Sequence, residues 1–248
     1  MQLVLDKFGK NVYNNTMFEK MKNPYKVLLL TIILFNCQSK KKIKSTVKSN
    51  EHLKNKIEEK KNSDNGNLIN EQNAVKFLFE YGNKNKENKV RIHTEYGDID
   101  IELYRNTHIH RSNFIYLTKK GYYDGTIFHR VVPNFIIQGG NSDDSKILIR
   151  RSKIGKYLLP PDTRKGNKHH RGVISMPSSE IDNPHKLASP YEFFIVQQKP
   201  GAYHLDKDYT AFGKVIKGID VVDKINREPT DNRETPEKNI YIKVSILD

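Results

Sequence analysis

Residues 128–141 constrain the fold of this chain more than any other segment. They read as an apolar strand, a short turn and a second apolar strand that ends in Gly139 and Gly140. The two strands are largely apolar, yet they hold an arginine, Arg130, and a glutamine, Gln138. The segment therefore predicts a β-hairpin that carries functional side chains as well as core residues.

Other short strands and two helices are expected around this hairpin. Residues 90–104 alternate on both sides of Tyr96 and Gly97, which is typical of a second β-hairpin. The remaining expected elements are strands at residues 191–196, 212–215 and 240–247 and helices at residues 108–120 and 218–225. The pattern predicts a mainly β domain.

Length and composition divide the chain into a folded domain and an N-terminal extension. A length of 248 residues is enough for one domain of about 150–160 residues with extensions. Residues 38–67 are rich in Lys, Asn, Ser and Glu, so we interpret them as a disordered linker. Residues 68–88 are expected to form a short helical extension, with a helix over residues 68–81 that ends at Gly82. The folded domain is expected over residues 89–248.

The hairpin motif resembles the signature of the cyclophilins, the β-barrel peptidyl-prolyl isomerases. Its Phe-His-Arg-Val block, the Phe135 that follows and its Gln-Gly-Gly block have the family's spacing. Two further blocks, at residues 172–178 and 204–215, are similar to the family's Ser-Met strand and to its Leu-Asp loop followed by Phe-Gly-Lys-Val. The resemblance implies a closed eight-stranded β-barrel capped by two helices, here with an N-terminal disordered tether.

The activity that this resemblance implies is rotation about X–Pro bonds, which needs no nucleophile, metal or cofactor. Rotation about a peptide bond faces a barrier of about 18–20 kcal/mol, so exchange before proline is slow. In the twisted state the prolyl nitrogen regains its lone pair and becomes a better acceptor. A guanidinium is always charged and offers donors in a rigid fork, so Arg130 is the expected catalytic residue. The simpler interpretation makes Arg130 a surface arginine in an ion pair.

The resemblance also implies which side chains bind the substrate. Phe135, Ile136 and Phe194 are expected to form the apolar floor of a proline pocket, for which ordinary core packing is the alternative. Gln138 is expected to hold Arg130 or the substrate backbone. The full set of expected substrate-binding residues is Phe135, Ile136, Gln138, Pro177, Ser178, Glu192, Phe194, His204, Leu205 and Tyr209.

Several of these positions depart from the family pattern. Glu192 follows Tyr191 where the family usually has Ser-Gln, and its carboxylate is expected either to pair with Arg130 and orient it or to weaken its field. Pro177 removes a backbone donor near the site, and His204 stands where many relatives carry tryptophan. These departures predict altered specificity. They also keep open a second hypothesis, a chaperone or scaffold that holds proline-containing segments with weak catalysis.

Two further segments lie outside the blocks that carry the resemblance. Residues 142–156 replace a loop that is usually glycine-rich in the family, and we expect either a solvated loop or one rim of the cleft that favours acidic substrates. His169 and His170 do not predict a metal site. Adjacent side chains on a strand face opposite ways, and no cysteine or acidic cluster accompanies them.

The N-terminal segment resembles a bacterial export signal. Two lysines precede a nine-residue apolar core, residues 27–35, which is too short to span a bilayer comfortably. Leu34 lies three positions before Cys37, as in the bacterial lipobox, which implies that Cys37 is lipidated and becomes the mature N-terminus. Asn36 departs from that pattern, so a non-lipidated export signal or a short membrane helix stays an alternative.

These features assign residues 1–37 to a signal and lipobox region. Residues 1–20 do not resemble a signal, so translation from Met17 or Met21 is an alternative start. The expected location is exported and lipid-anchored to a bacterial envelope membrane, facing the periplasm or the surface.

The excess of positive charge is concentrated in the N-terminal third of the chain. The formal net charge is +14, and residues 1–89 hold 18 Lys and Arg against 9 Asp and Glu, whereas residues 90–248 hold 25 against 20. A mildly basic barrel argues against a nucleic-acid groove. The expected partners are proline-containing polypeptides and the membrane, and the protein is expected to be a monomer. A basic adhesin or polyanion binder that uses the lysine-rich tether is a weaker alternative.

Overall fold

The structure, a computed structural model, describes residues 68–178 and 182–247. Asn65–Asp248 belong to one compact unit of the chain. The predicted signal and lipobox region with Cys37, and the predicted linker at residues 38–67, lie outside the described residues.

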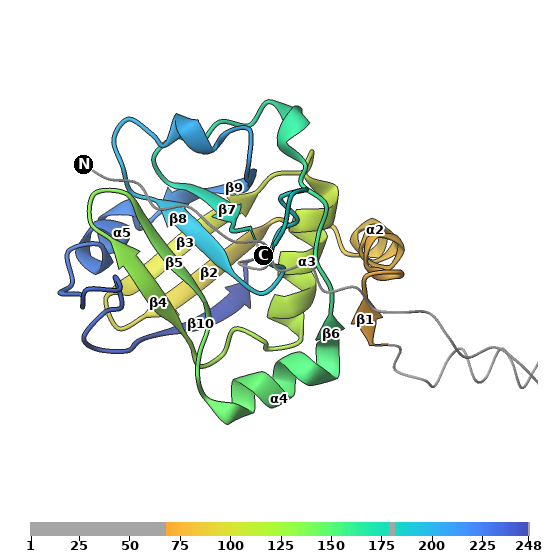
Figure 1. The fold of residues 1–248 in the computed structure, drawn as a ribbon, viewed down its shortest axis with the longest axis horizontal. Helices are drawn as coiled ribbons and strands as arrows, with labels where there is room; N and C mark the ends of the chain where they lie inside the picture. Colours follow the sequence, from red (N-terminus) through yellow and green to blue (C-terminus); the bar gives the residue numbers. More distant parts are fainter. Residues whose placement is uncertain (1–67, 179–181, 248) are drawn as a thin grey trace, which may run out of the picture. The chain divides into compact units, whose positions relative to one another are not determined.

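Eight antiparallel strands close into a barrel, which confirms the predicted fold class (Figure 1). Their order around the barrel is β10-β2-β3-β9-β7-β8-β5-β4. The barrel strands are β2 Lys89–Thr94, β3 Gly97–Leu103, β4 Thr126–Val132, β5 Ile136–Asn141, β7 Val173–Met176, β8 Phe193–Val196, β9 Thr210–Lys217 and β10 Ile240–Ile246. Closure pairs every strand on both sides, so the sheet has no free edge.

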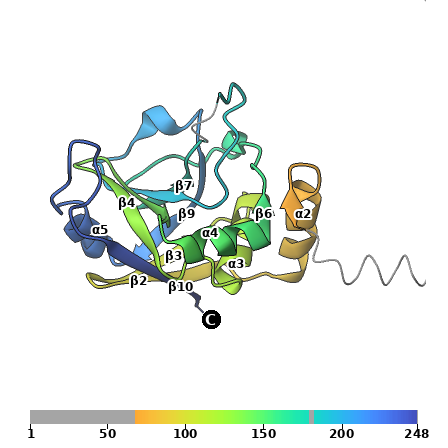
Figure 2. The same cartoon turned by 60° about the horizontal axis from the view of Figure 1, so that its bottom comes forward.

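The two helices predicted from the sequence are also present. Helix α3 spans His108–Lys119 and helix α5 spans Ile219–Ile225. Figures 1 and 2 show them on different sides of the barrel. Helix α3 contacts β9 and β10, whereas α5 contacts β3. Each helix buries apolar side chains, such as Phe114 of α3 and Val222 of α5, against the barrel.

Helix α2 spans Ala74–Lys84 and packs against α3. The prediction of a helix over residues 68–81 is therefore wrong at both ends. Strand β1, Ile69–Asn70, occupies the start of that range, and the helix continues past Gly82. A side chain at Gly82 would collide with side chains of α3. This glycine therefore permits close helix packing and does not terminate the helix.

Residues 142–156 contain helix α4, Ser145–Ile154, so the expectation of a loop is wrong. The carboxylate of Asp144 caps the first turn by accepting a hydrogen bond from a backbone N–H at 2.8 Å. Arg150 donates hydrogen bonds to three backbone carbonyls in the turn after α3. Strand β6, Gly155–Lys156, follows directly and pairs with β1 in parallel.

Two apolar clusters occupy different sides of β8. Adjacent side chains of a strand point to opposite faces, so Phe193 enters the barrel core while Phe194 belongs to a separate cluster. The buried members of this smaller cluster are Ile136, Phe194, Val196, Ala202 and Leu205. The smaller cluster provides the apolar base on which the candidate site is built.

Candidate active site

A cavity of about 350 Å³ lies over the smaller apolar cluster. Side chains from β4, β5 and β8 reach it, together with the end of β7 and the segment around the short helical turn Tyr203–Leu205. The lining residues are His129, Arg130, Phe135, Ile136, Gln138, Pro177, Ser178, Phe194, Leu205 and Tyr209. All of them except His129 belong to the set that sequence analysis selected. We call this space the substrate cavity.

Aromatic contacts shape the floor of the substrate cavity. Phe194 is almost fully buried, and the ring of Tyr209 meets it edge-on at 5.8 Å between ring centres. Phe135 stacks on the imidazole of His204 at 5.5 Å. His204 is not among the lining residues, so it supports the cavity through Phe135. The floor is built of aromatic and aliphatic side chains, which suit an apolar group such as a proline ring.

Arg130 and Gln138 meet above this floor because the β4–β5 register places them opposite each other. The Nη1 atom of Arg130 donates to Oε1 of Gln138 at 3.4 Å. The irregular register of β4 on either side of Phe128 sets which side chains of this strand face the cavity. A charged donor and an amide therefore converge on one side of an apolar space.

Glu234 is the ion-pair partner of Arg130, which sequence analysis did not find. The Oε2 atom of Glu234 accepts a hydrogen bond from Nε of Arg130 at 2.7 Å. The same oxygen lies 2.7 Å from Nη2 of the guanidinium. The backbone N–H of Val131 donates to the carbonyl of Glu234 at 2.8 Å, which fixes this loop residue beside β4. Both side chains are 39% exposed, so the pair is worth at most about 1 kcal/mol and a substrate can compete for the guanidinium.

Glu192 lies behind Gln138, and the hypothesis that it pairs with Arg130 is not what the structure shows. Its carboxylate accepts hydrogen bonds from the side-chain amides of Gln138 and Asn141, each at 3.1 Å. It is not among the lining residues of the substrate cavity. Glu192 therefore acts on the site by fixing which end of the Gln138 amide faces Arg130.

Comparison with known proteins agrees with this geometry. Residues 89–245 match the family described as cyclophilin type peptidyl-prolyl cis-trans isomerase/CLD. The chain belongs to the cyclophilin family. Its folded part is a cyclophilin-type peptidyl-prolyl cis-trans isomerase domain, as the motif at residues 128–141 implies.

Relatives of this cyclophilin domain occur in proteins of different length. The chain is 38% identical over 143 residues to a peptidyl-prolyl cis-trans isomerase of Acinetobacter baylyi. That match covers 57% of this chain and 73% of the Acinetobacter protein. The chain is also 38% identical over 167 residues to the peptidyl-prolyl cis-trans isomerase-like 2 of Rhizopus delemar. That match covers 66% of this chain but only 30% of the Rhizopus protein.

A solved structure also resembles the barrel. A cyclophilin type peptidyl-prolyl cis-trans isomerase of Cryptosporidium parvum, crystallised in the presence of the dipeptide Ala-Pro, is 30% identical with a TM-score of 0.52. The match covers 64% of this chain and 99% of that protein.

A buried histidine supports the floor of the cyclophilin cavity from behind. Nδ1 of His169 lies 2.9 Å from Oδ1 of Asp206, and Nε2 lies 3.0 Å from Oγ of Ser175. The imidazole stacks on Phe194. Burial lowers the pKa of His169, although the Asp206 carboxylate opposes this effect. The network links β7 to the turn that carries Leu205, and no local sequence pattern pointed to it.

Pro177 and Ser178 form the rim at the end of β7. The carbonyl of Pro177 accepts a hydrogen bond from the backbone N–H of Ser189 at 2.8 Å. The hydroxyl of Ser178 accepts one from the side-chain amide of Asn183 at 2.9 Å. This rim is therefore tied to the segment that follows residues 179–181. Pro177 lines the cavity without a backbone N–H of its own.

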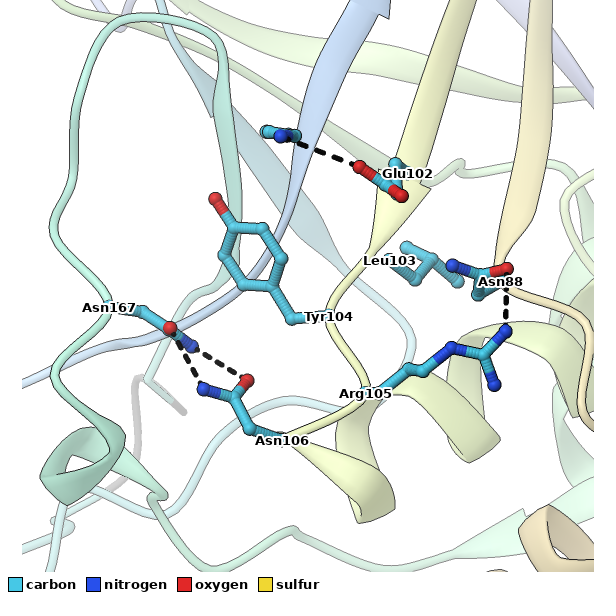
Figure 3. Close-up of a pocket in the computed structure, with 8 residues that line it drawn as sticks. Asn88, Glu102, Leu103, Tyr104, Arg105, Asn106 and Asn167 are labelled. Atoms are coloured by element: carbon cyan, nitrogen blue, oxygen red, sulfur yellow. Dashed lines mark hydrogen bonds and ion pairs between the residues drawn. The ribbon is translucent and has the colours of Figure 1, made fainter.

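A second hollow of about 310 Å³ lies at another part of the barrel (Figure 3). Asn106 and Asn167 exchange hydrogen bonds between their side-chain amides, and Glu102 pairs with Lys214 at 3.4 Å. We call it the amide cleft; its lining residues are Asn88, Glu102, Leu103, Tyr104, Arg105, Asn106, Asn167 and Lys214.

The described residues lack two further features, a cluster of metal ligands and a membrane-spanning helix. Among residues 68–178 and 182–247, no group of three or more His, Cys, Asp or Glu side chains is placed to hold a metal ion. Within the same ranges, every helix is too short or too polar to traverse a bilayer.

Proposed function

We propose that this chain accelerates rotation about X–Pro bonds of exported or envelope proteins, with Arg130 as the catalytic residue and no covalent intermediate. The convergence of Arg130 and Gln138 over the apolar floor supports this proposal most strongly. The proline ring rests on Phe135 and Phe194. Arg130 donates to the prolyl nitrogen as the bond twists and its lone pair becomes available.

The proposed substrates are proline-containing polypeptides. The apolar floor suits a proline ring, and the related Cryptosporidium protein was crystallised in the presence of Ala-Pro. We expect Gln138, whose amide is held by Glu192, to hydrogen-bond the substrate backbone beside the proline. The altered rim at Pro177 and Ser178 sets which flanking residues are accepted.

The proposed location is the bacterial envelope, with the domain anchored through lipidated Cys37. The apolar run at residues 27–35 and the position of Leu34 support this proposal. A Cys37→Ser variant is expected to leave the membrane fraction and to lose labelling by a fatty-acid analogue. Retention of the label in that variant would exclude Cys37 as the lipidated residue.

A scaffold that binds proline-containing segments with weak catalysis is the second candidate. One observation favours it, namely that Glu234 already occupies two nitrogens of the Arg130 guanidinium. In that case the cavity binds peptide without accelerating exchange.

One NMR experiment separates the two candidates. Exchange of a short X–Pro peptide is measured with the compact unit Asn65–Asp248, with and without Arg130→Ala. The proposal predicts rapid exchange in the presence of the protein and a fall of about 100-fold in the variant. Peptide binding without acceleration by the folded protein would support the scaffold and overturn the enzyme.

A further inference from the structure

Helix α4 presents apolar side chains that the isomerase site does not use. Leu148 and Ile149 are 53% and 54% exposed, whereas Ile147 and Ile154 of the same helix are buried. None of the residues of α4 lines the substrate cavity. The helix therefore has one face for the domain and a second, partly apolar face that the described part of the chain does not cover.

The exposed face of α4 is held rigidly against the domain. Arg150 Nη1 donates to the carbonyls of Gly121, Tyr122 and Asp124 at 2.5, 3.0 and 2.8 Å. The guanidinium of Arg151 lies over the ring of Tyr191 at 4.5 Å. These contacts use two of the basic side chains for attachment. Leu148 and Ile149 consequently stay directed outward.

The helix itself carries only positive charge, whereas exposed Asp143 and Asp144 precede it and exposed Glu71 follows the β1 residue that pairs with Lys156. Residues 145–156 contain five Lys and Arg and no Asp or Glu. Lys146, Lys153 and Lys156 are exposed and lie in the same segment as Leu148 and Ile149. Exposed aliphatic side chains flanked by lysines match the two layers of an anionic bilayer surface, where acyl chains lie beneath phosphate groups.

The end of α4 is also where the N-terminal segment joins the domain. Parallel pairing sets Ile69 opposite Gly155 and Asn70 opposite Lys156, directly after α4. Figures 1 and 2 show α4 leading into β6 beside this part of the chain. Leu68, which is 51% exposed, therefore lies at the same end of the domain. Residues 38–67 separate it from Cys37.

We propose that α4, together with Leu68, forms the surface by which the domain rests on an anionic phospholipid bilayer. Leu148 and Ile149 enter the interfacial layer, and the three exposed lysines contact phosphate groups. The inference rests on the membrane anchorage proposed above and adds which face of the domain meets the bilayer. A tether to Cys37 keeps the domain close to the bilayer and so raises its effective concentration there. A surface that binds lipid only weakly is then enough to orient the domain.

Vesicle binding by Asn65–Asp248 tests this proposal without Cys37 or the apolar run at residues 27–35. Vesicles of phosphatidylglycerol and phosphatidylethanolamine are expected to sediment the protein, whereas vesicles of phosphatidylcholine alone are not. Binding is expected to fall about tenfold between about 50 mM and 500 mM salt. The double variant Leu148→Ser, Ile149→Ser is expected to lose about fivefold in binding.

A matched control replaces an apolar side chain elsewhere on the barrel. Ile216→Ser removes a 47% exposed residue of β9, next to α5 and away from α4, and is expected to bind as the unaltered protein does. Lack of binding to the anionic vesicles, or equal binding by the double variant, would overturn the proposal. So would a dimer in gel filtration that the double variant converts to monomer, because the face would then meet a second copy. Lipidation of Cys37 is tested separately, so its failure leaves the vesicle result distinct.

Discussion

The substrate cavity and the amide cleft have similar volumes, about 350 and 310 Å³, but they differ in what their polar groups do. In the substrate cavity, Arg130 and Gln138 lie over aromatic side chains. In the amide cleft, Asn106 and Asn167 bind each other and Glu102 pairs with Lys214, beside the ring of Tyr104 (Figure 3). Volume alone therefore does not identify a site; a few convergent polar groups above an apolar floor do.

Two buried histidines, His169 and His110, differ in the hydrogen bonding of their ring nitrogens. His169, behind the substrate cavity, has partners at both ring nitrogens. His110 lies in α3, which begins shortly after Asn106, and packs near Phe212. Among the described residues, neither ring nitrogen of His110 has a hydrogen-bond partner. The substrate cavity is thus backed by a polar network, whereas the buried ring of His110 has no hydrogen-bond partner among the described residues.

Arginine replacement should separate the two hollows most clearly. Arg130→Ala is expected to lower kcat/KM by about 100-fold, because it removes the donor that favours the twisted bond. Arg105→Ala, at the amide cleft, is the matched control and is expected to leave kcat/KM unchanged. Peptide exchange measured by NMR gives both values. Equal losses in the two variants would remove the functional distinction between the hollows.

Acid should destabilise the domain through His110. Burial lowers its pKa to about 4, below its ordinary value, so the unfolded chain binds a proton that the folded chain does not. The full free energy of unfolding is therefore kept above about pH 6.5, the pKa of an unfolded histidine. It falls as the pH falls, and the loss reaches roughly 2 kcal/mol at pH 5. Urea unfolding at pH 7 and pH 5 measures the difference.

A His110→Leu variant provides the control for this pH effect. It removes the titrating group, so most of the loss between pH 7 and pH 5 is expected to disappear. The remainder belongs partly to His169, whose pKa burial also lowers. An unchanged loss in the variant would show that His110 is not the source.

Removal of the ring of Phe135 should weaken substrate binding. Phe135→Ala is expected to raise KM about tenfold with little change in kcat, because the floor binds ground and transition states alike. Tyr104→Ala in the amide cleft is the matched change and is expected to leave KM unaltered. A fall in kcat with constant KM would instead assign Phe135 to the transition state.

The smallest effect is expected from Glu234→Gln. The amide keeps one acceptor for Arg130 but loses the charge, so kcat is expected to fall about threefold, and stability by less than about 1 kcal/mol. Full kinetics at constant pH separate kcat from KM. A rise in kcat would mean that the Glu234 carboxylate competes with the substrate for the guanidinium.

Much of the barrel and of the substrate cavity could be predicted because the signals are local. Alternation along β2 and β3, and the spacing of Arg130, Phe135 and Gln138, depend on neighbours a few residues away. The resemblance then extended this prediction to Phe194, Leu205 and Tyr209, which come from distant segments but line the same cavity. The prediction was wrong at residues 142–156, where this chain replaces the loop of the family. The cap at Asp144 and the buried side chains of Ile147 and Ile154 stabilise helix α4 there.

The sequence by itself determined most barrel strands and the helices α3 and α5, since period and spacing are properties of the chain, whereas the resemblance to the cyclophilins supplied the side chains of the cavity. Only the tertiary structure decided which residues pair with the side chains of the site through ion pairs and hydrogen bonds. Glu234 pairs with Arg130 across 104 positions, and His169 meets Asp206 across 37. Such contacts depend on barrel closure and leave no periodic trace in the sequence. Burial decided the rest, since the pKa of His110 depends on the solvent-free surroundings that folding creates around it.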